Sequence, residues 1–139
     1  MDDISTVFPY ALGDEEKTTS FSSLGEVGQV SESGEIVIEQ KVFDNLQVKT
    51  VGAVMVKMDI EGFELRALKG MQTLIKESKP YLAICIYHKE KDLYEIAKYI
   101  KSLNADYRLY IRGGWHLECW AVPQRHFSED YTLGEEEKA

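Results

Sequence analysis

Hydrophobic and polar positions follow two different patterns along this chain, and the change falls near residue 50. Beyond that point, short apolar runs are typical of strands. The segments between them are apolar at every third or fourth position, which predicts helices. Pro80 follows the first of these segments, where a helix stop is expected. The expected strands are 53–58, 82–87, 106–112 and 118–122, and the expected helices are 64–77 and 92–103.

The first 50 residues are rich in Gly, Ser, Thr and acidic residues, and they contain shorter strand-like pieces. The alternation in Ile36-Val37-Ile38 indicates an antiparallel excursion, and Gly25, Gly28 and Gly34 mark its turns. The strand-like pieces are 6–12, 18–22 and 35–42.

The order strand, helix, strand, helix, strand, strand sets the expected topology. Crossover helices join parallel strands, whereas the last two strands are linked by Gly113-Gly114 alone, so one strand near the edge should run antiparallel. The run 53–58 is almost entirely apolar, as expected for a strand covered on both faces. The sequence therefore predicts an α/β fold with a mostly parallel sheet and one antiparallel strand near its edge. Several doubly wound folds share this layout.

Length and charge narrow the class of protein. The 139 residues fit one domain, with an irregular β-rich part at 1–50, an α/β core at 51–127 and a frayed acidic tail at 128–139. The net charge of −8 and the pI near 4.9 argue against sequence-independent binding of nucleic acid and against binding to anionic lipid. The apolar runs are far shorter than the roughly 20 residues that a membrane span needs. The acidic start is unlike a signal peptide, so we expect a cytoplasmic protein.

Candidate chemistry gathers where the run 53–58 ends, at Asp59 and Glu61. Ligands of open α/β sheets bind outside the carboxyl ends of the strands, and Gly62 permits a sharp turn there. Side chains alternate along a strand, so Asp59 and Glu61 are expected to point to opposite sides. Either carboxylate could bind a ligand or take up a proton, or it could be a solvated loop acid. Glu64 is expected to be a helix-start carboxylate that faces the positive end of the helix dipole.

The run from Lys57 to Glu64 resembles the Lys-x-Asp-x-Glu-Gly-x-Glu signature of the FkbM family of S-adenosylmethionine-dependent methyltransferases. Further pieces follow in the order of that family, from about residue 7 to residue 123. They are 7–14, Phe43-Asp44-Asn45-Leu46, Leu68-Lys69-Gly70, Ile84-Cys85-Ile86-Tyr87-His88, Asp92-Leu93 and Tyr110-Ile111-Arg112. After Arg112 the sequence departs from the family pattern, because Gly113-Gly114-Trp115 stands where a His commonly follows.

The resemblance implies a Rossmann-like class I methyltransferase fold and methyl transfer from S-adenosylmethionine to a hydroxyl group of a small molecule or glycan. It places Asp59 in the pocket shared by donor and acceptor, as a candidate for removing the hydroxyl proton, with Glu61 either supporting that pocket or binding and orienting the acceptor. His88 would be an acid or base on the acceptor side, a role that suits imidazole near neutral pH. The alternative for His88 is an exposed residue at a strand end. Ala11 and Leu12 would lie near the adenine ring of the cofactor.

A metal site and a disulfide are two further chemical possibilities in this sequence. Asp59, Glu61 and His88 could gather a divalent cation, but without a second His or Cys we expect no metal site. Cys85 and Cys119 both fall in apolar strand-like runs, which favours buried free thiols in a reducing compartment and leaves a disulfide as the alternative.

The resemblance also implies a truncated domain. Class I methyltransferases bind their cofactor with a Gly-rich turn after the first strand and an acid after the second, and neither element is found here. The chain resembles the last two-thirds of such a domain, so cofactor binding would require the missing part. An open sheet edge favours homo-oligomers. The alternative function is therefore a non-catalytic partial domain that serves as an oligomeric or assembly component.

Overall fold

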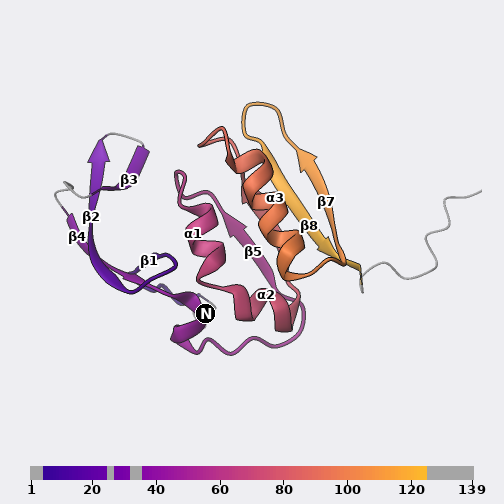
Figure 1. The fold of residues 1–139 in the computed structure, drawn as a ribbon. Helices are drawn as coiled ribbons and strands as arrows, with labels where there is room; N and C mark the ends of the chain where they lie inside the picture. The colour runs from indigo at the N-terminus through magenta and orange to yellow at the C-terminus, as the bar shows by residue number, and fades with distance from the viewer. Residues whose placement is uncertain (1–4, 25–26, 32–35, 125–139) are drawn as a thin grey trace, which may run out of the picture.

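The computed structural model describes residues 5–24, 27–31 and 36–124, and they form two four-stranded sheets and three α-helices (Figure 1). None of the described helices is long and apolar enough to cross a membrane. The elements of the first half are β1 (Ala11–Leu12), β2 (Lys17–Leu24), β3 (Val27–Ser31), β4 (Ile36–Lys41) and the 3-10 helix η1 (Phe43–Leu46). Those of the second half are β5 (Met55–Met58), α1 (Glu64–Lys69), α2 (Gln72–Ser78), β6 (Tyr81–Cys85), α3 (Asp92–Leu103), β7 (Tyr107–Arg112) and β8 (Glu118–Pro123).

The second sheet has the strand order β5-β6-β8-β7. β5 and β6 are parallel, whereas β8 is antiparallel to both of its neighbours, β6 and β7. The expected antiparallel strand is therefore present, but the sheet is mixed and the expectation of a mostly parallel sheet is not confirmed. The cause is the tight β7–β8 connection, which returns β8 into the space between β6 and β7. Gly113 in that connection has φ 107, and a Cβ there would overlap the carbonyl oxygen of His116.

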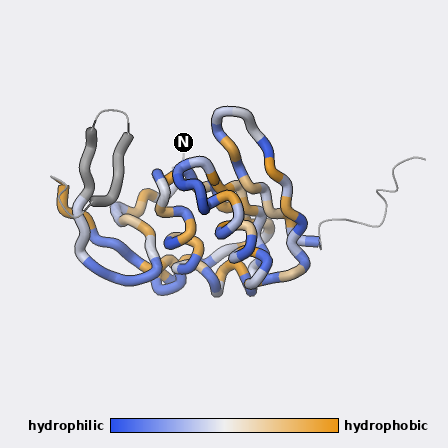
Figure 2. The backbone as a smooth tube through the Cα atoms, turned by 45° about the horizontal axis from the view of Figure 1, so that its top comes forward, coloured by the Kyte–Doolittle hydropathy of each residue, from blue (hydrophilic) through white to orange (hydrophobic). Residues whose placement is uncertain are grey.

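The hydrophobic core lies between the second sheet and its helices, which cover one face of the sheet (Figure 1). Hydrophobic positions recur along these elements among hydrophilic ones (Figure 2). The hydroxyl of Tyr107, buried in this core, donates a 2.7 Å hydrogen bond to the carbonyl oxygen of Pro80. Residues without exposed surface include Leu68 and Ile75 from the first two helices, Ile96 and Ile100 from α3, and Leu82 and Ile84 from β6.

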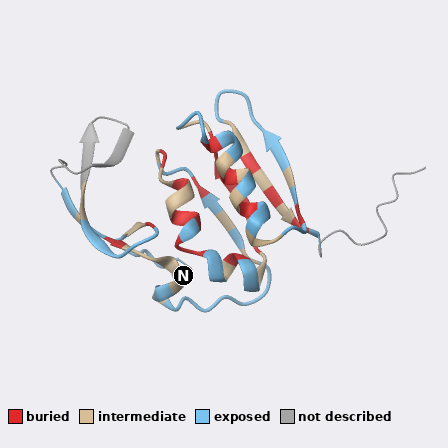
Figure 3. Ribbon diagram, in the orientation of Figure 1, coloured by how far each residue is buried: buried red, intermediate tan, exposed pale blue. Residues whose placement is uncertain are grey.

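β5 is less buried than the sequence predicts (Figure 3). Met58 at its end is buried, but Met55 is 56% exposed, so the expectation that both faces of this strand are covered is wrong. In the part of the chain that the structure describes, β5 pairs only with β6 and forms the edge of its sheet. An edge strand can be as apolar as a central one, so its sequence does not distinguish the two.

The single helix expected at 64–77 is divided into α1 and α2 at Gly70. A Cβ at Gly70 would overlap the carbonyl oxygen of Gly13, so the two backbones are in direct contact. The amide of Asp44 donates to the carbonyl oxygen of Gly70 at 3.0 Å. The Asp44 carboxylate then accepts hydrogen bonds from the amides of Thr73 and Leu74, at 2.8 and 3.2 Å, which caps the start of α2. Residues of the first half thus end one helix and begin the next.

The first sheet has the strand order β1-β4-β2-β3. β2 is antiparallel to both β3 and β4, as the predicted excursion requires, and β1 is parallel to β4. Of the strand expected at 6–12, only Ala11–Leu12 is extended and paired. The sequence predicts a turn at Gly28, but this residue lies in β3 and pairs with Ser23 of β2. The tail 128–139 lies outside the described residues, and the division into segments stays a prediction.

Candidate active site

Two carboxylates converge where β5 ends. The strand stops at Met58, and Glu61 and Gly62 follow with φ values of 55 and 89, both in the left-handed region. A non-glycine residue there costs of the order of 1–3 kcal/mol, and such positions cluster at functional sites. This turn brings Asp59 Oδ1 and Glu61 Oε2 to 3.4 and 3.3 Å from Nε2 of His88. The expectation that Asp59 and Glu61 point to opposite sides is wrong, because strand alternation ends at Met58.

His88 follows β6, at the same edge of the sheet as the end of β5, because these two strands are parallel. Its side chain is only 8% exposed, so the alternative of an exposed residue at a strand end is wrong. The imidazole lies 4.1 Å from the ring of Tyr87, centroid to centroid. Within the described residues, neither ring nitrogen has a hydrogen-bond partner.

Glu64 is the member of the site whose role sequence reasoning missed. Its side chain has no exposed surface, although it opens α1 as predicted. Oε1 accepts a 2.8 Å hydrogen bond from the amide of Ile60 and lies 3.0 Å from Nδ1 of His88. The spacing to Glu61 gave no signal, because Glu61 and Gly62 adopt positive φ and the helix begins only at Glu64.

Hydrogen bonds keep Asp59 ionised. Burial alone would raise the pKa of Asp59, but hydrogen bonds from the hydroxyl of Tyr87, at 3.0 Å, and from the thiol of Cys85 lower it. The charges of His88 and Lys57 act in the same direction, and the pKa lies below its ordinary value. Burial and the bond to Asp59 raise the pKa of Tyr87 to about 12, so Tyr87 remains a hydrogen-bond donor.

A further acid lies close to this group. Asp92, the first residue of α3, is 3% exposed, and burial together with the negative charge of Glu64 raises its pKa. Lys89 is directed elsewhere, since its ammonium group donates to the carbonyl oxygen of Gly62. The surroundings of His88 are therefore strongly acidic.

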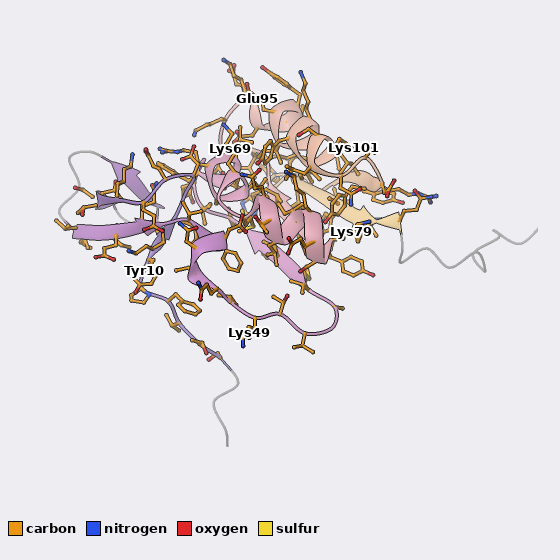
Figure 4. The ribbon with its side chains drawn as sticks, turned by 60° about the horizontal axis from the view of Figure 1, so that its bottom comes forward. Tyr10, Lys49, Lys69, Lys79, Glu95 and Lys101 are labelled. Atoms are coloured by element: carbon orange, nitrogen blue, oxygen red, sulfur yellow. The ribbon has the colours of Figure 1, made fainter. Side chains whose placement is uncertain are left out.

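A cavity of about 760 Å³ adjoins the two carboxylates. It follows the free edge of β5 between the two sheets, and every residue of β5 contributes to its wall. Ala11, Leu12, Asp59 and Glu61, four of the predicted site residues, line it together, whereas His88 lies behind the carboxylates and is not part of the wall. Most of the remaining wall is apolar, including Tyr10 (labelled in Figure 4), Ile38, Phe43, Phe63 and Met71.

Both cysteines are free and buried, as the apolar runs predict. Cys119 pairs with Ile84, so Cys85, one residue further along β6, faces the opposite side of the sheet from Cys119. A disulfide between them is therefore excluded in this structure.

Fold and site together define a mixed α/β protein with a ligand-sized cavity at the carboxyl end of a parallel strand pair. The model of the methyltransferase FkbM domain matches residues 1–111, and the chain belongs to this family, which confirms the resemblance in the signature. The crystal structure of a methyltransferase FkbM from Methylobacillus flagellatus KT is similar, with 30% sequence identity and a TM-score of 0.62. The similarity covers 84% of this chain but 28% of that one. Among curated proteins, no sequence matches the chain.

Proposed function

We propose that the chain functions as a methyltransferase that transfers a methyl group from S-adenosylmethionine to a hydroxyl oxygen of a small molecule or glycan. The observation that carries this proposal is the cavity, where Ala11 and Leu12 share one space with the carboxylates of Asp59 and Glu61. Family membership supports the reaction type. We further propose that the second sheet is part of a Rossmann-like class I methyltransferase fold, for which its inserted antiparallel strand is the supporting feature.

The residues of the cavity fit such a methyl donor. Its volume of about 760 Å³ lies within the range of roughly 300–1,000 Å³ typical of small-molecule sites. An apolar wall suits an adenine ring. Asp59, held ionised by its hydrogen bonds, suits the positive charges of a sulfonium and an ammonium group.

When bound, S-adenosylmethionine supplies an electrophilic methyl group on a positively charged sulfur. The hydroxyl oxygen of the acceptor gains this methyl group and loses its proton, and the sulfur leaves as a neutral thioether. The chain contributes alignment and a proton acceptor. Because its pKa is lowered, Asp59 is a weak base, and together with Glu61 it orients the acceptor in the cavity. The proton passes by way of these carboxylates to the imidazole of His88, whose Nε2 lies 3.4 and 3.3 Å from them.

Calorimetric titration of the full chain with S-adenosylhomocysteine, the demethylated product, tests this proposal. We expect weak but saturable heat, because only part of the expected cofactor site, Ala11, Leu12 and Asp59, lies in the cavity. Leu12→Trp should abolish this heat, because the larger side chain fills the cavity. Leu93→Trp on the exposed side of α3 is the matched control and should leave binding unchanged. Thermal melts verify that both variants fold. If millimolar ligand gives neither heat nor thermal stabilisation with the unsubstituted chain, the proposal is wrong for this polypeptide.

A second candidate function is an oligomeric or assembly component. It is favoured by apolar side chains at and before the free edge of β5, where Val51 is 95% and Met55 56% exposed. Sedimentation velocity tests it: a concentration-dependent dimer that Met55→Lys dissociates supports this function, and a monomer at all concentrations refutes it. We also propose a cytoplasmic location, which the two free thiols support.

A further inference from the structure

Three potential metal ligands meet beside the cavity. One donor atom each from Asp59, Glu61 and His88 lies within 4.8 Å of the other two. We call these residues the carboxylate–histidine cluster. Asp59 and Glu61 line the cavity, and their side chains are 47% and 30% exposed, so the cluster is open on this side. It is closed on the other side by the buried ring of His88.

The buried ring of His88 supplies the main argument for an ion at this cluster. Its side chain is more than nine-tenths buried, yet within the described residues neither nitrogen has a hydrogen-bond partner. Buried polar atoms are almost always hydrogen-bonded, so a buried imidazole that contacts carboxylates at 3.0–3.4 Å without a hydrogen bond needs an explanation. A cation bound by Nε2 and the two carboxylate oxygens would give Nε2 the partner that it lacks.

The distances fit ligands of one ion better than they fit hydrogen bonds. Ligands about 2.1 Å from a metal ion, at tetrahedral or octahedral angles, lie about 3.0–3.4 Å from one another. The distances from Nε2 to the oxygens of Asp59 and Glu61 are 3.4 and 3.3 Å. Direct N–H···O hydrogen bonds are usually shorter, at about 2.9–3.0 Å.

The neighbouring groups also favour a cation. Glu64 Oε1 lies 3.0 Å from the other ring nitrogen, where outer carboxylates commonly orient metal-binding histidines. Among the described residues, His88 is the only basic residue that forms ion pairs with Asp59, Glu61 and Glu64. The ammonium group of Lys57 is bound instead to Glu118, at 2.8 Å.

We propose that Asp59, Glu61 and His88 bind one divalent first-row transition metal ion through their carboxylate oxygens and Nε2, with the remaining coordination positions open to the cavity. Mixed oxygen and imidazole ligands suit Mn²⁺, Fe²⁺ or Zn²⁺ better than Ca²⁺. This departs from the sequence expectation of no metal, which rested on the lack of a second His or Cys. The left-handed turn at Glu61 supplies a second carboxylate instead.

The inference does not depend on methyl transfer, since an ion can bind whether or not the donor does. The two uses of the cluster exclude each other at any one moment, because an Nε2 atom bound to metal cannot accept a proton.

Titration of the full chain with Mn²⁺, followed by the electron paramagnetic resonance signal of the free ion, tests the proposal. We expect one saturable site per chain. His88→Gln and Glu61→Gln should each weaken binding about tenfold or more, and Glu64→Gln by about 10–100-fold. Asp106→Asn, at an exposed position outside the cluster, is the matched control and should bind like the unsubstituted chain.

A second measurement needs no variant and covers the case in which substitutions unfold the protein. Zn²⁺ added to the unsubstituted chain should shift the imidazole ¹⁵N resonance of His88 Nε2 and leave that of His116 in place. The proposal is overturned if Mn²⁺ shows no saturable binding up to about 1 mM, or if binding persists unchanged in His88→Gln. It is equally overturned if Zn²⁺ binds without shifting Nε2, because the site then excludes the histidine.

Discussion

Nδ1 of His88 lies 3.0 Å from Oε1 of Glu64, a carboxylate with no exposed surface. The same oxygen accepts the amide hydrogen of Ile60. One buried carboxylate therefore contacts both the turn after β5 and the residue that follows β6, and it fixes the two relative to the start of α1.

Two substitutions of Glu64 should show how much its hydrogen bond to the Ile60 amide and its negative charge each change the free energy of unfolding. Glu64→Ala leaves the amide of Ile60 without its side-chain acceptor, which should lower the free energy of unfolding by about 1 kcal/mol. Glu64→Gln retains an oxygen acceptor and removes repulsion with Asp92, so its loss should be smaller. Urea unfolding of the two variants measures the difference. Equal losses would show that the hydrogen bond to Ile60 contributes little.

Asp44 should act as the N-terminal cap of α2. Asp44→Ala removes the acceptor for the amides of Thr73 and Leu74, and we expect a loss of about 1 kcal/mol in the free energy of unfolding. Asp106→Ala, in the exposed turn before β7, is the control and should change stability by less than about 0.5 kcal/mol. Thermal or urea unfolding checks both, and similar values for the two variants would contradict the capping role.

The pair between Lys57 and Glu118 predicts a pH dependence. The hydrogen bond from Lys57, at 2.8 Å, is the main cause that lowers the pKa of Glu118 below its ordinary value. A lowered pKa in the folded state stabilises the fold above the unfolded pKa, and this contribution disappears as the pH falls through the folded pKa. The difference in unfolding free energy between the unsubstituted chain and Glu118→Gln should therefore be constant near neutral pH and shrink below about pH 4.3.

The pair is partly exposed, so the whole effect should amount to about 0.5 kcal/mol. Urea unfolding at a series of pH values measures it. Glu77→Gln on the exposed side of α2 serves as the control. A difference for Glu118→Gln that grows on acidification would contradict the assigned direction.

The two thiols should resist alkylation while the chain is folded. Burial raises the pKa of Cys85 and of Cys119 to about 11, so only about one thiol in a thousand is ionised at pH 8. We expect iodoacetamide to label the native chain about 100-fold more slowly than the chain in urea, where ordinary thiol pKa values return. Mass spectrometry counts the adducts. One rapidly labelled cysteine per native chain would show that its burial is not maintained in solution.

The elements that the sequence predicted well owe their structure to local pattern. α3 has the predicted bounds, Asp92–Leu103. Its apolar face and its two ends depend only on residues that are close together in the sequence. β6, β7 and β8 lie within one or two residues of their predicted ranges for the same reason. The strand-end position of Asp59 followed from the end of an apolar run.

The features that were missed depend on residues far apart in the chain or on a backbone angle. The break at Gly70 is imposed by Gly13 and Asp44, which precede it by more than twenty residues. The convergence of Glu61 with Asp59 rests on the positive φ of Glu61, a conformation uncommon for this residue type. The burial of His88 and Glu64 arises only when β5 and β6 pair. No local pattern contains these relationships.

At Gly70 the two halves of the molecule meet main chain against main chain, without an intervening side chain. Their separation at that point is therefore set by the main chain and does not depend on side-chain volume. A methyl group added at residue 70 would overlap the carbonyl oxygen of Gly13 and push the two backbones apart. The segment that carries Ala11 and Leu12 would then move away from Asp59 and Glu61, which line the same cavity.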